Sequence, residues 1–528
     1  MKKYYPLAII LIVATLLRMY HNTDISLWHD EAFSVLMIRY GWAEMFRRLA
    51  LDVHPPAYYI ALRLWSYVFG VKMWSLRGFS VLFGVLGVWA TWLFSKEIFS
   101  NKQIPLWAAI LAAINPYTID YSTEARMYTF GAFFALLAAY FLTKALRGQR
   151  QFYDDEKLNM PNMPKDIALK KQFLWNYFWF ALCTGIIMMT HYYLLFTAAA
   201  LMLYGLFFCI KHYKGQVGRY VWFLVFCALS FVPFLPWLKV FISQVKSVGQ
   251  SYWIPAMDIW SIPGTVWTIL LGIGHDNTKT VTLVLMTLIS LFSIYMFWDF
   301  IKKTDAWEKW MVLWCFLAPF IGSILFVIIA RLKGSQSTVY QERYFLFASV
   351  FYIIALAAWL SEIKIKWLSV SIFIVYVVFN FFAFFHNWST LDISNKPGMN
   401  GAAAYLGANV EPGDHVFIGT SFEFFNYKYY QQVYYKTPMP PLLFTGGRSD
   451  ISQISSVEGV ALLSDSDLAP TFAQFVHPGD TEWLLWTQAF SANKPQVPLN
   501  WTQVDEQQYP DVRPYVGTTI YVDEYKVN

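Results

Sequence analysis

Acidic and imidazole side chains gather in two short polar segments near the amino terminus. Asp30 and Glu31 are adjacent, and Asp52 and His54 follow about twenty residues later, just before Pro55-Pro56. Adjacent residues of a helix or strand point in different directions, so one carboxylate can act on a substrate while its neighbour holds a metal or a cation. His54 is able to bind phosphate, transfer a proton or ligate a metal. These residue types predict acid–base or metal-assisted chemistry.

The composition places this chemistry in a membrane protein. Of the 528 residues, 57% are hydrophobic and 14% charged, and apolar runs of about twenty residues recur from Tyr4 to Phe385. The net charge of +6 does not indicate a nucleic-acid partner, because most Lys and Arg residues lie in short loops between apolar runs, where membrane orientation alone places them. All four cysteines lie inside apolar runs, which predicts neither a disulfide framework nor a cysteine metal site.

The apolar runs predict about eleven transmembrane helices together with interfacial helices. The first follows Lys2 and Lys3, with its amino terminus on the cytoplasmic side. The others are expected at 78–95, 105–120, 127–146, 173–190, 194–210, 220–238, 281–301, 309–330, 344–361 and 367–386. The apolar piece at 57–70 is short for a crossing, and we interpret it as interfacial or re-entrant because the basic segment 144–171 then lies inside.

This topology gathers the polar chemistry on the outer side. The Asp30 segment, Glu124 to Arg126, His191, a long loop at 239–280 and the segment 331–343 all face outward. After residue 386 the composition changes, and helical and strand-like pieces alternate. A helix is expected at 398–406 and strands at 415–419, 459–463, 483–488 and 518–522. We therefore predict a membrane-embedded catalytic domain at 1–386 and an extracytoplasmic α/β domain at 387–528.

Two arginines stand at the outer ends of predicted spans. Arg126 follows Glu124 after Asn115-Pro116, and Arg343 precedes Tyr344. An arginine at a helix end often only marks the membrane interface or forms a surface ion pair. An anionic, phosphate-linked lipid substrate would instead need fixed guanidinium groups at this depth.

Taken together, these motifs resemble those of the membrane glycosyltransferases of GT-C fold. The closest groups are the bacterial relatives of protein O-mannosyltransferases and of the lipid A aminoarabinose transferase. The resemblance covers roughly residues 1–390, and the pair of motifs at the amino terminus is its most specific part. It is carried by Asp30-Glu31, Asp52-Val53-His54-Pro55-Pro56, Ser122-Thr123-Glu124-Ala125-Arg126-Met127-Tyr128 and Glu342-Arg343-Tyr344.

The resemblance implies a transferase that takes a sugar from a polyprenyl-phosphate carrier on the outer leaflet. It implies Asp30 as the general base, supported by Glu31 and Asp52. The implied ligands of the donor phosphate are His54, Arg126, Arg343 and Tyr344, and the implied substrate or metal residues are Glu124, His275 and Asp276. The aminoarabinose transferase carries Lys at the position of His54, so its sugar and acceptor do not transfer to this chain.

The implied reaction is a single inverting displacement by an acceptor hydroxyl of a glycan, lipid or protein, for example a cell-envelope glycan. The enzyme would be a multi-pass protein of the plasma membrane, in contact with membrane lipid. No cofactor is implied with certainty, and a divalent metal ion is a candidate. The alternative is a polytopic transporter. Transporters tend to place charges near the bilayer midplane on paired repeats, whereas here the ionisable residues gather at one face and no repeat is visible.

Overall fold

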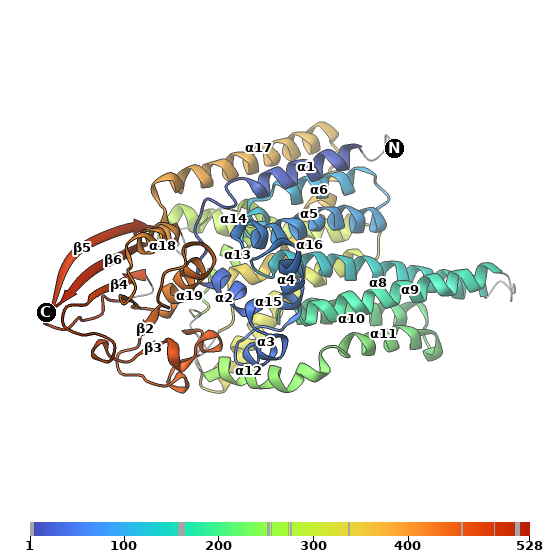
Figure 1. The fold of residues 1–528 in the computed structure, drawn as a ribbon. Helices are drawn as coiled ribbons and strands as arrows, with labels where there is room; N and C mark the ends of the chain where they lie inside the picture. The colour runs from blue at the N-terminus through green and yellow to red at the C-terminus, as the bar shows by residue number, and fades with distance from the viewer. Residues whose placement is uncertain are drawn as a thin grey trace.

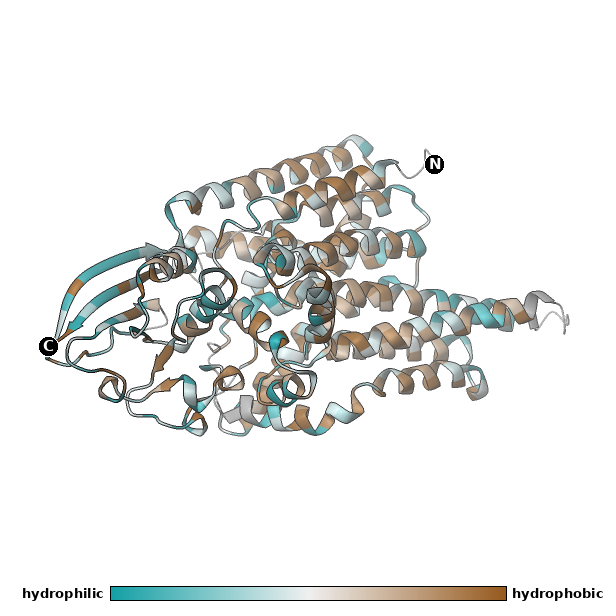
Figure 2. Cartoon of the chain, in the orientation of Figure 1, coloured by the Kyte–Doolittle hydropathy of each residue, from teal (hydrophilic) through white to brown (hydrophobic). Residues whose placement is uncertain are grey.

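The computed structural model describes residues 5–156, 164–250, 254, 256–272, 274, 277–335, 338–455, 458–489, 492–512 and 518–528. Figure 1 shows a bundle of long helices and, at one end of it, a smaller part that contains every labelled strand. The chain begins at the opposite end of the bundle and ends in the smaller part. Figure 2 shows apolar residues along the bundle, whereas β5 (Trp501–Pro510) and β6 (Thr519–Val527) are largely polar.

Seven stretches of helix among the described residues are long and apolar enough to cross a bilayer. The long helices that they contain are α5 (Met73–Ile98), α8 (Tyr128–Glu156), α10 (Leu194–His212), α14 (Thr280–Lys303), α15 (Lys309–Leu332), α16 (Leu346–Ser361) and α17 (Lys366–Thr390). Hydrocarbon offers the backbone no hydrogen-bond partners, and a helix satisfies its backbone groups internally. The chain is a multi-pass membrane protein.

The other predicted spans are also helical, with different lengths and shapes. α1 (Tyr5–Met19) has 15 residues and α6 (Gln103–Ile114) has 12, which is short against the roughly 20 residues of an upright crossing. α9 (Pro164–Met188) has 25 residues and packs along α8. The span predicted at 220–238 is a bent pair, because its two helical segments meet at 45°.

Proline explains this bend. α11 (Val221–Phe231) ends before Pro233, and Pro236 lies in the short 3-10 helix that leads into α12 (Leu238–Gln250). Proline has no backbone N–H and its ring clashes with the preceding turn of a helix. The prediction of a loop at 239–280 is therefore wrong in part. The start of this segment belongs to α12, and the segment also contains α13 (Ser261–Leu271).

Three short helices follow α1, two in the polar stretch and one in the apolar piece after it. They are α2 (His29–Arg39), α3 (Trp42–Leu49) and α4 (Ala57–Phe69). The 13 residues of α4 rise only about 20 Å, less than the roughly 30 Å of a hydrocarbon core. The backbone N–H of Ala57 donates to the carbonyl of Met189 at 2.8 Å, which ties the start of α4 to the bundle. The length of α4 agrees with the interfacial or re-entrant segment predicted at 57–70.

The smaller part contains one six-stranded sheet in the order β3-β2-β1-β4-β6-β5. Its first four strands are β1 (His415–Ile418), β2 (Leu442–Phe444), β3 (Leu468–Ala469) and β4 (Thr481–Thr487). β1 is parallel to β2 and β4, and Phe417 lies opposite Leu442 on one side and Leu484 on the other. β6 is antiparallel to β4 and β5. With α18 (Gly398–Asn409) and α19 (Ser421–Tyr430), these strands form the predicted α/β fold.

Three of the four predicted strands are present as β1, β4 and β6. The strand predicted at 459–463 is wrong, because Val460–Leu462 form a 3-10 turn. Gly459 before it has φ +78°, a left-handed conformation that ends extended backbone and that glycine adopts without steric cost. β2 and β3 have only three and two residues, so they carry no alternation that a sequence pattern could reveal.

The sheet part and the bundle meet at the amino end of α2. The backbone N–H of Leu27 donates to the Tyr430 hydroxyl at 2.9 Å. The ring of His29 lies 4.8 Å from that of Phe422 and 5.5 Å from that of Phe425, measured between ring centroids. The first turn of α2 is thus held by α19 on one side and by the bundle on the other.

Candidate active site

The first turn of α2 carries the two adjacent carboxylates. Trp28 at the N-cap is extended, with φ −107° and ψ 172°, and no side chain caps the helix. Acidic residues in a first turn interact favourably with the positive end of the helix dipole. Oδ2 of Asp30 faces Arg343, whereas both carboxylate oxygens of Glu31 face Arg77. The two carboxylates point to different partners, as their adjacency predicted.

Asp30 lies between two guanidinium groups. Its Oδ2 accepts a hydrogen bond from Nη1 of Arg343 at 2.8 Å and lies 3.9 Å from Nη2 of Arg126. Nη1 of Arg126 also donates to the backbone carbonyl of Asp30 at 3.1 Å and to Oγ of Ser34 at 3.3 Å. The Asp30 side chain is 20% exposed and that of Arg126 only 3%. A ligand can therefore reach the Asp30 side chain, while the Arg126 guanidinium is buried and held by its hydrogen bonds.

The charge of Asp30 is set by this pair of arginines. Burial by itself would raise the pKa of the Asp30 carboxyl, because desolvation disfavours the charged form. The guanidinium groups of Arg126 and Arg343 oppose that effect and hold the pKa of Asp30 well below its usual range. Asp30 is thus ionised at neutral pH, and it becomes more basic when one of the two cations is drawn away.

Glu31 forms a buried ion pair with Arg77. Arg77 of α5 donates to its two carboxylate oxygens at 2.8 and 2.7 Å, and the Glu31 side chain is 0% exposed. Arg77 also donates to the backbone carbonyls of Asn22 at 2.7 Å and Ile25 at 2.9 Å. Glu31, predicted among the catalytic carboxylates, therefore lies where it holds backbone in place and does not face a cavity.

The loop that carries Arg126 starts from a capped turn. The side chain of Asn115 accepts a hydrogen bond from the backbone N–H of Thr118 at 3.0 Å, and Pro116 occupies the first position of α7 (Pro116–Asp120). An asparagine cap followed by proline is a favoured helix start, because proline lacks the N–H that would be left without a partner there.

Two buried charges then fix the same loop. Nε of Arg18 in α1 donates to Oγ of Ser122 at 3.1 Å, and the backbone N–H of Ala125 donates to Oε1 of Glu31 at 2.8 Å. Arg18 is 1% exposed, so its contact is not a surface interaction. The loop that carries the guanidinium of Arg126 is thereby held by Arg18 and Glu31.

Asp52 and His54 form a second polar pair beside Arg126. Oδ2 of Asp52 lies 2.9 Å from Nδ1 of His54, and Nε2 of the same ring lies 3.4 Å from Nη2 of Arg126. A histidine that receives a hydrogen bond from arginine at Nε2 donates its Nδ1 proton to the carboxylate. The ring of His191 lies 5.7 Å from that of His54, and burial lowers the pKa of His191 well below its ordinary value. The structure brings Asp52, His54 and Arg126 together as predicted.

Arg343 and Tyr344 lie in the 3-10 turn Glu342–Phe345 at the start of α16, with the Arg343 guanidinium 5.8 Å from the Tyr344 ring centroid. The Arg343 guanidinium lies 5.7 Å from the ring centroid of Trp28. The ring of Tyr344 lies 4.7 Å from that of His191. Because successive residues face two different cavities, this turn separates them.

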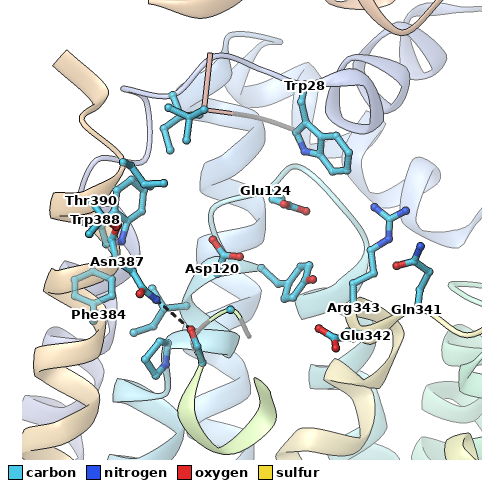
Figure 3. Close-up of a pocket in the computed structure, with 18 residues that line it drawn as sticks. Trp28, Asp120, Glu124, Gln341, Glu342, Arg343, Phe384, Asn387, Trp388 and Thr390 are labelled. Atoms are coloured by element: carbon cyan, nitrogen blue, oxygen red, sulfur yellow. Dashed lines mark hydrogen bonds between the residues drawn. The ribbon is translucent and has the colours of Figure 1, made fainter. Parts of the chain in front are cut away.

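The first cavity has a volume of about 630 Å³ and is lined mainly by polar and aromatic residues. Figure 3 shows Asp120 and Glu124 between Trp388 of α17 on one side and Arg343 on the other, with Trp28 near Glu124. The lining residues also include Tyr121, Gln341, Glu342, Phe384, Asn387 and Thr390.

The second cavity, of about 280 Å³, is mainly apolar. His54, His191 and Tyr344 line it, and much of the remaining lining comes from α10, α12 and α15. Those residues include Leu195, Phe196, Phe241, Val245 and Phe326. The charged cluster of Asp30, Arg126 and Arg343 thus lies between a polar cavity and an apolar one.

The remaining predicted site residues have different outcomes. Glu124 lines the polar cavity and is 6% exposed. His275 and Asp276 lie outside the described residues. Within the part of the chain that the structure describes, no three His, Cys, Asp or Glu side chains are grouped closely enough to hold a metal ion.

The sequence interpretation missed three residues that shape the site. Arg77 lies inside an apolar run, and a charge in such a run was the signal that could have identified it. Arg18 carried the same signal near the end of the first run. Trp28 carried none, because a tryptophan next to a membrane segment is ordinary.

Comparison with known proteins connects this arrangement to one fold. A model of the dolichyl-phosphate-mannose-protein mannosyltransferase family matches residues 53–153. No curated protein sequence matches the chain significantly. ArnT from Cupriavidus metallidurans, in a crystal structure bound to undecaprenyl phosphate, is similar with a TM-score of 0.59 at 11% identity, over 98% of this chain and 97% of ArnT.

A second likeness is to the archaeal oligosaccharyltransferase AglB from Archaeoglobus fulgidus, in complex with an inhibitory peptide and a dolichol-phosphate. Its TM-score is 0.52 at 12% identity, over 92% of this chain and 69% of AglB. At such low identity these likenesses establish the fold and nothing finer. The chain has the GT-C fold of the membrane glycosyltransferases.

Proposed function

We propose that this chain is a glycosyltransferase that moves a sugar from a polyprenyl-phosphate carrier to an acceptor hydroxyl, with Asp30 as the base. The observation that carries the proposal is the ion pair of Asp30 with Arg343, at a turn where Arg343 lines the polar cavity and Tyr344 lines the apolar one. A lipid-linked sugar has the same division, because its chain is apolar and its sugar polar. The similar ArnT structure holds undecaprenyl phosphate and the similar AglB structure holds a dolichol-phosphate, which are lipid phosphates of the kind that such donors carry.

The donor would lie with its lipid in the apolar cavity and its phosphate at the two arginines. His54 and Tyr344 stand at the inner end of that cavity, next to Arg126 and Arg343. A guanidinium binds phosphate through charge-assisted, often bidentate hydrogen bonds. A phosphate bound to Arg343 would compete with Asp30 for the positive charge of the guanidinium, which now lies 2.8 Å from the Asp30 carboxylate. Donor binding would therefore release the base.

The chemical step then follows. The acceptor oxygen forms a bond to the anomeric carbon while its proton passes to Asp30. The bond between the anomeric carbon and the phosphate oxygen breaks at the same time, and the electron pair leaves with the polyprenyl phosphate. Arg126 and Arg343 stabilise the charge that develops on this leaving group. A single displacement of this kind inverts the anomeric configuration.

Two features extend the proposal. We assign the catalytic function to residues 1–386 and a supporting role to the α/β part at 387–528, whose helix α19 holds the first turn of α2. Positive charge in the loops of the other face favours an extracytoplasmic site in the plasma membrane.

The experiment that tests the function is a transfer assay with purified protein in nanodiscs. Radiolabelled polyprenyl-phosphate sugars of several kinds, together with a membrane extract as the acceptor source, should give a labelled product and free polyprenyl phosphate. The anomeric configuration of the product should be opposite to that of the donor. If no donor is consumed with any sugar, while the protein binds undecaprenyl phosphate, the transferase assignment is wrong.

A further inference from the structure

The polar cavity beside Asp30 has an unusual balance of charge. Its described lining includes the acidic side chains Asp120, Glu124 and Glu342, against a single cationic group, Arg343. That guanidinium is already engaged by the carboxylate of Asp30 at 2.8 Å. The described walls of the cavity therefore present net negative charge to whatever occupies it.

The negative charge of the cavity wall also affects the pKa of a tyrosine that lines it. Tyr121 lies between Asp120 and Glu124 in the chain and lines the cavity. Burial raises the pKa of the Tyr121 hydroxyl, and the neighbouring Glu124 and Asp120 raise it further. A further negative charge on this wall is thus disfavoured.

The rest of the lining fits a polyhydroxylated ligand. Trp28 and Trp388 present aromatic rings, and the indole Nε1 of Trp28 is buried without a hydrogen-bond partner among the described residues. Aromatic rings pack against apolar faces while their polar ends bind hydrogen-bond partners. Carboxylates accept hydrogen bonds and donate none when ionised, so they match the hydroxyl donors of a sugar. A cavity of about 630 Å³ is of the size that holds a small-molecule ligand or the end of a larger one.

Two of the elements around the cavity are fixed by their own contacts. The side-chain amide of Asn387 in α17 donates to the carbonyl of Gly272 at 3.1 Å, which is the dashed line in Figure 3. The hydroxyl of Tyr117 in α7 donates to the carbonyl of Glu342 at 2.6 Å. The helix that carries Trp388 and the turn that carries Glu342 are therefore each bonded to a neighbouring element, as a preformed site requires.

We infer that this cavity is the acceptor site and that it takes the end of a neutral or amine-bearing glycan and rejects acceptors that carry phosphate or carboxylate groups. This inference rests on the proposed function and adds the class of the acceptor. Like charges brought together across an interface cost several kcal/mol, so acidic walls select against anionic ligands. Phosphate binding is then left to Arg126 and Arg343, where Arg343 stands at the boundary between the two cavities.

The test uses the full-length protein in nanodiscs, titrated with soluble glycans in matched sets. Each set contains one oligosaccharide in a neutral form, an amine-bearing form and a 6-phosphorylated form. At least one neutral or amine-bearing member should bind, and its phosphorylated counterpart should bind about tenfold more weakly or worse. Undecaprenyl phosphate is titrated in parallel, and its affinity reports whether the donor site is intact.

Variants separate a charge effect from a structural one. Glu124→Gln should narrow the preference for the neutral form over the phosphorylated form by several-fold while leaving the affinity for undecaprenyl phosphate unchanged. Trp388→Ala should weaken glycan binding about tenfold, whereas Trp367→Ala on the exposed start of the same helix should not.

Two results would overturn the inference. One is tighter binding of the phosphorylated form within its set. The other is failure of all glycans to bind while undecaprenyl phosphate still binds, which would refute the acceptor site and leave the donor assignment standing. Loss of undecaprenyl phosphate binding in the parent protein would instead refute the proposed function.

Discussion

Nη1 of Arg343 lies 2.8 Å from Oδ2 of Asp30, although 313 residues separate the two in the chain. The proposed base and a proposed phosphate ligand are thus partners in the same ion pair. A phosphate that draws Arg343 away raises the basicity of Asp30 at the moment when the donor is in place. Donor-dependent activation of the base follows from this one contact.

Replacing the base should abolish chemistry and leave binding intact. In Asp30→Asn the side chain keeps its size and loses its basicity, so turnover should fall by about 10² to 10⁴. The affinity for undecaprenyl phosphate should not fall, because an anion near the arginines is removed. Asp24→Asn, an exposed acid of the preceding turn, is the control. Near-normal turnover in Asp30→Asn would exclude Asp30 as the base.

Phosphate binding by Arg343 should depend on the planar shape of its guanidinium as well as on its charge. Arg343→Lys keeps the cation and loses the planar fork, so it should bind undecaprenyl phosphate more weakly than the parent and retain part of the activity. Arg343→Ala should be nearly inactive. Arg331→Ala, at the exposed end of α15, should behave like the parent. If Arg126→Ala and Arg343→Ala both bind the lipid as tightly as the parent, the phosphate is held elsewhere.

The ion pair of Glu31 and Arg77 should matter for stability. Removing one partner leaves a buried charge without compensation, which costs about 3 to 5 kcal/mol. Glu31→Gln or Arg77→Met should therefore lower the apparent Tm and the yield of monodisperse protein, and the double variant should recover part of the loss. Glu44→Gln removes an exposed ion pair on α3 and should change the apparent Tm little. A parent-like Tm in both single variants would show that the pair is not needed for folding.

Glu423 of α19 should make the sheet part less stable as the pH rises. Burial raises its pKa to about 8, and the charge of Asp511 adds to the effect. The folded state keeps a proton that the unfolded state loses above its ordinary pKa of about 4.3, so stability declines between pH 4.3 and 8. Glu423→Gln should therefore raise the apparent Tm at pH 7.5 by more than at pH 5. Glu411→Gln, in an exposed turn, should show no such difference. An equal effect at both pH values would mean that Glu423 is ionised in the fold.

The orientation of the chain can be measured by cysteine labelling. The positive-inside rule places the loop after α10 in the cytoplasm and the sheet part outside. Gln216→Cys should be labelled only after the membrane is permeabilised, and Ser466→Cys in intact cells; both positions are exposed. Labelling of both from the same side would contradict the interpretation of α4 as a helix that does not cross.

The sequence by itself determined the membrane class, the positions of the long apolar helices and the polar segments that hold the candidate site. Apolar runs of about twenty residues have few alternatives to helix in a bilayer, and charge beside them is costly enough to mark function. For this reason Asp30, Asp52, His54, Arg126 and Arg343 were identified without coordinates. The strands β1, β4 and β6 were predicted because short runs of β-branched and aromatic residues are a local property.

Only the tertiary structure decided which of these residues act on one another. Glu31 and Asp30 are equivalent in the sequence, and they differ because Arg77 meets one and Arg343 the other. The division between an apolar and a polar cavity at Arg343 and Tyr344 also arises from packing of helices far apart in the chain. A local pattern carries no information on such contacts, because they depend on how whole helices are placed.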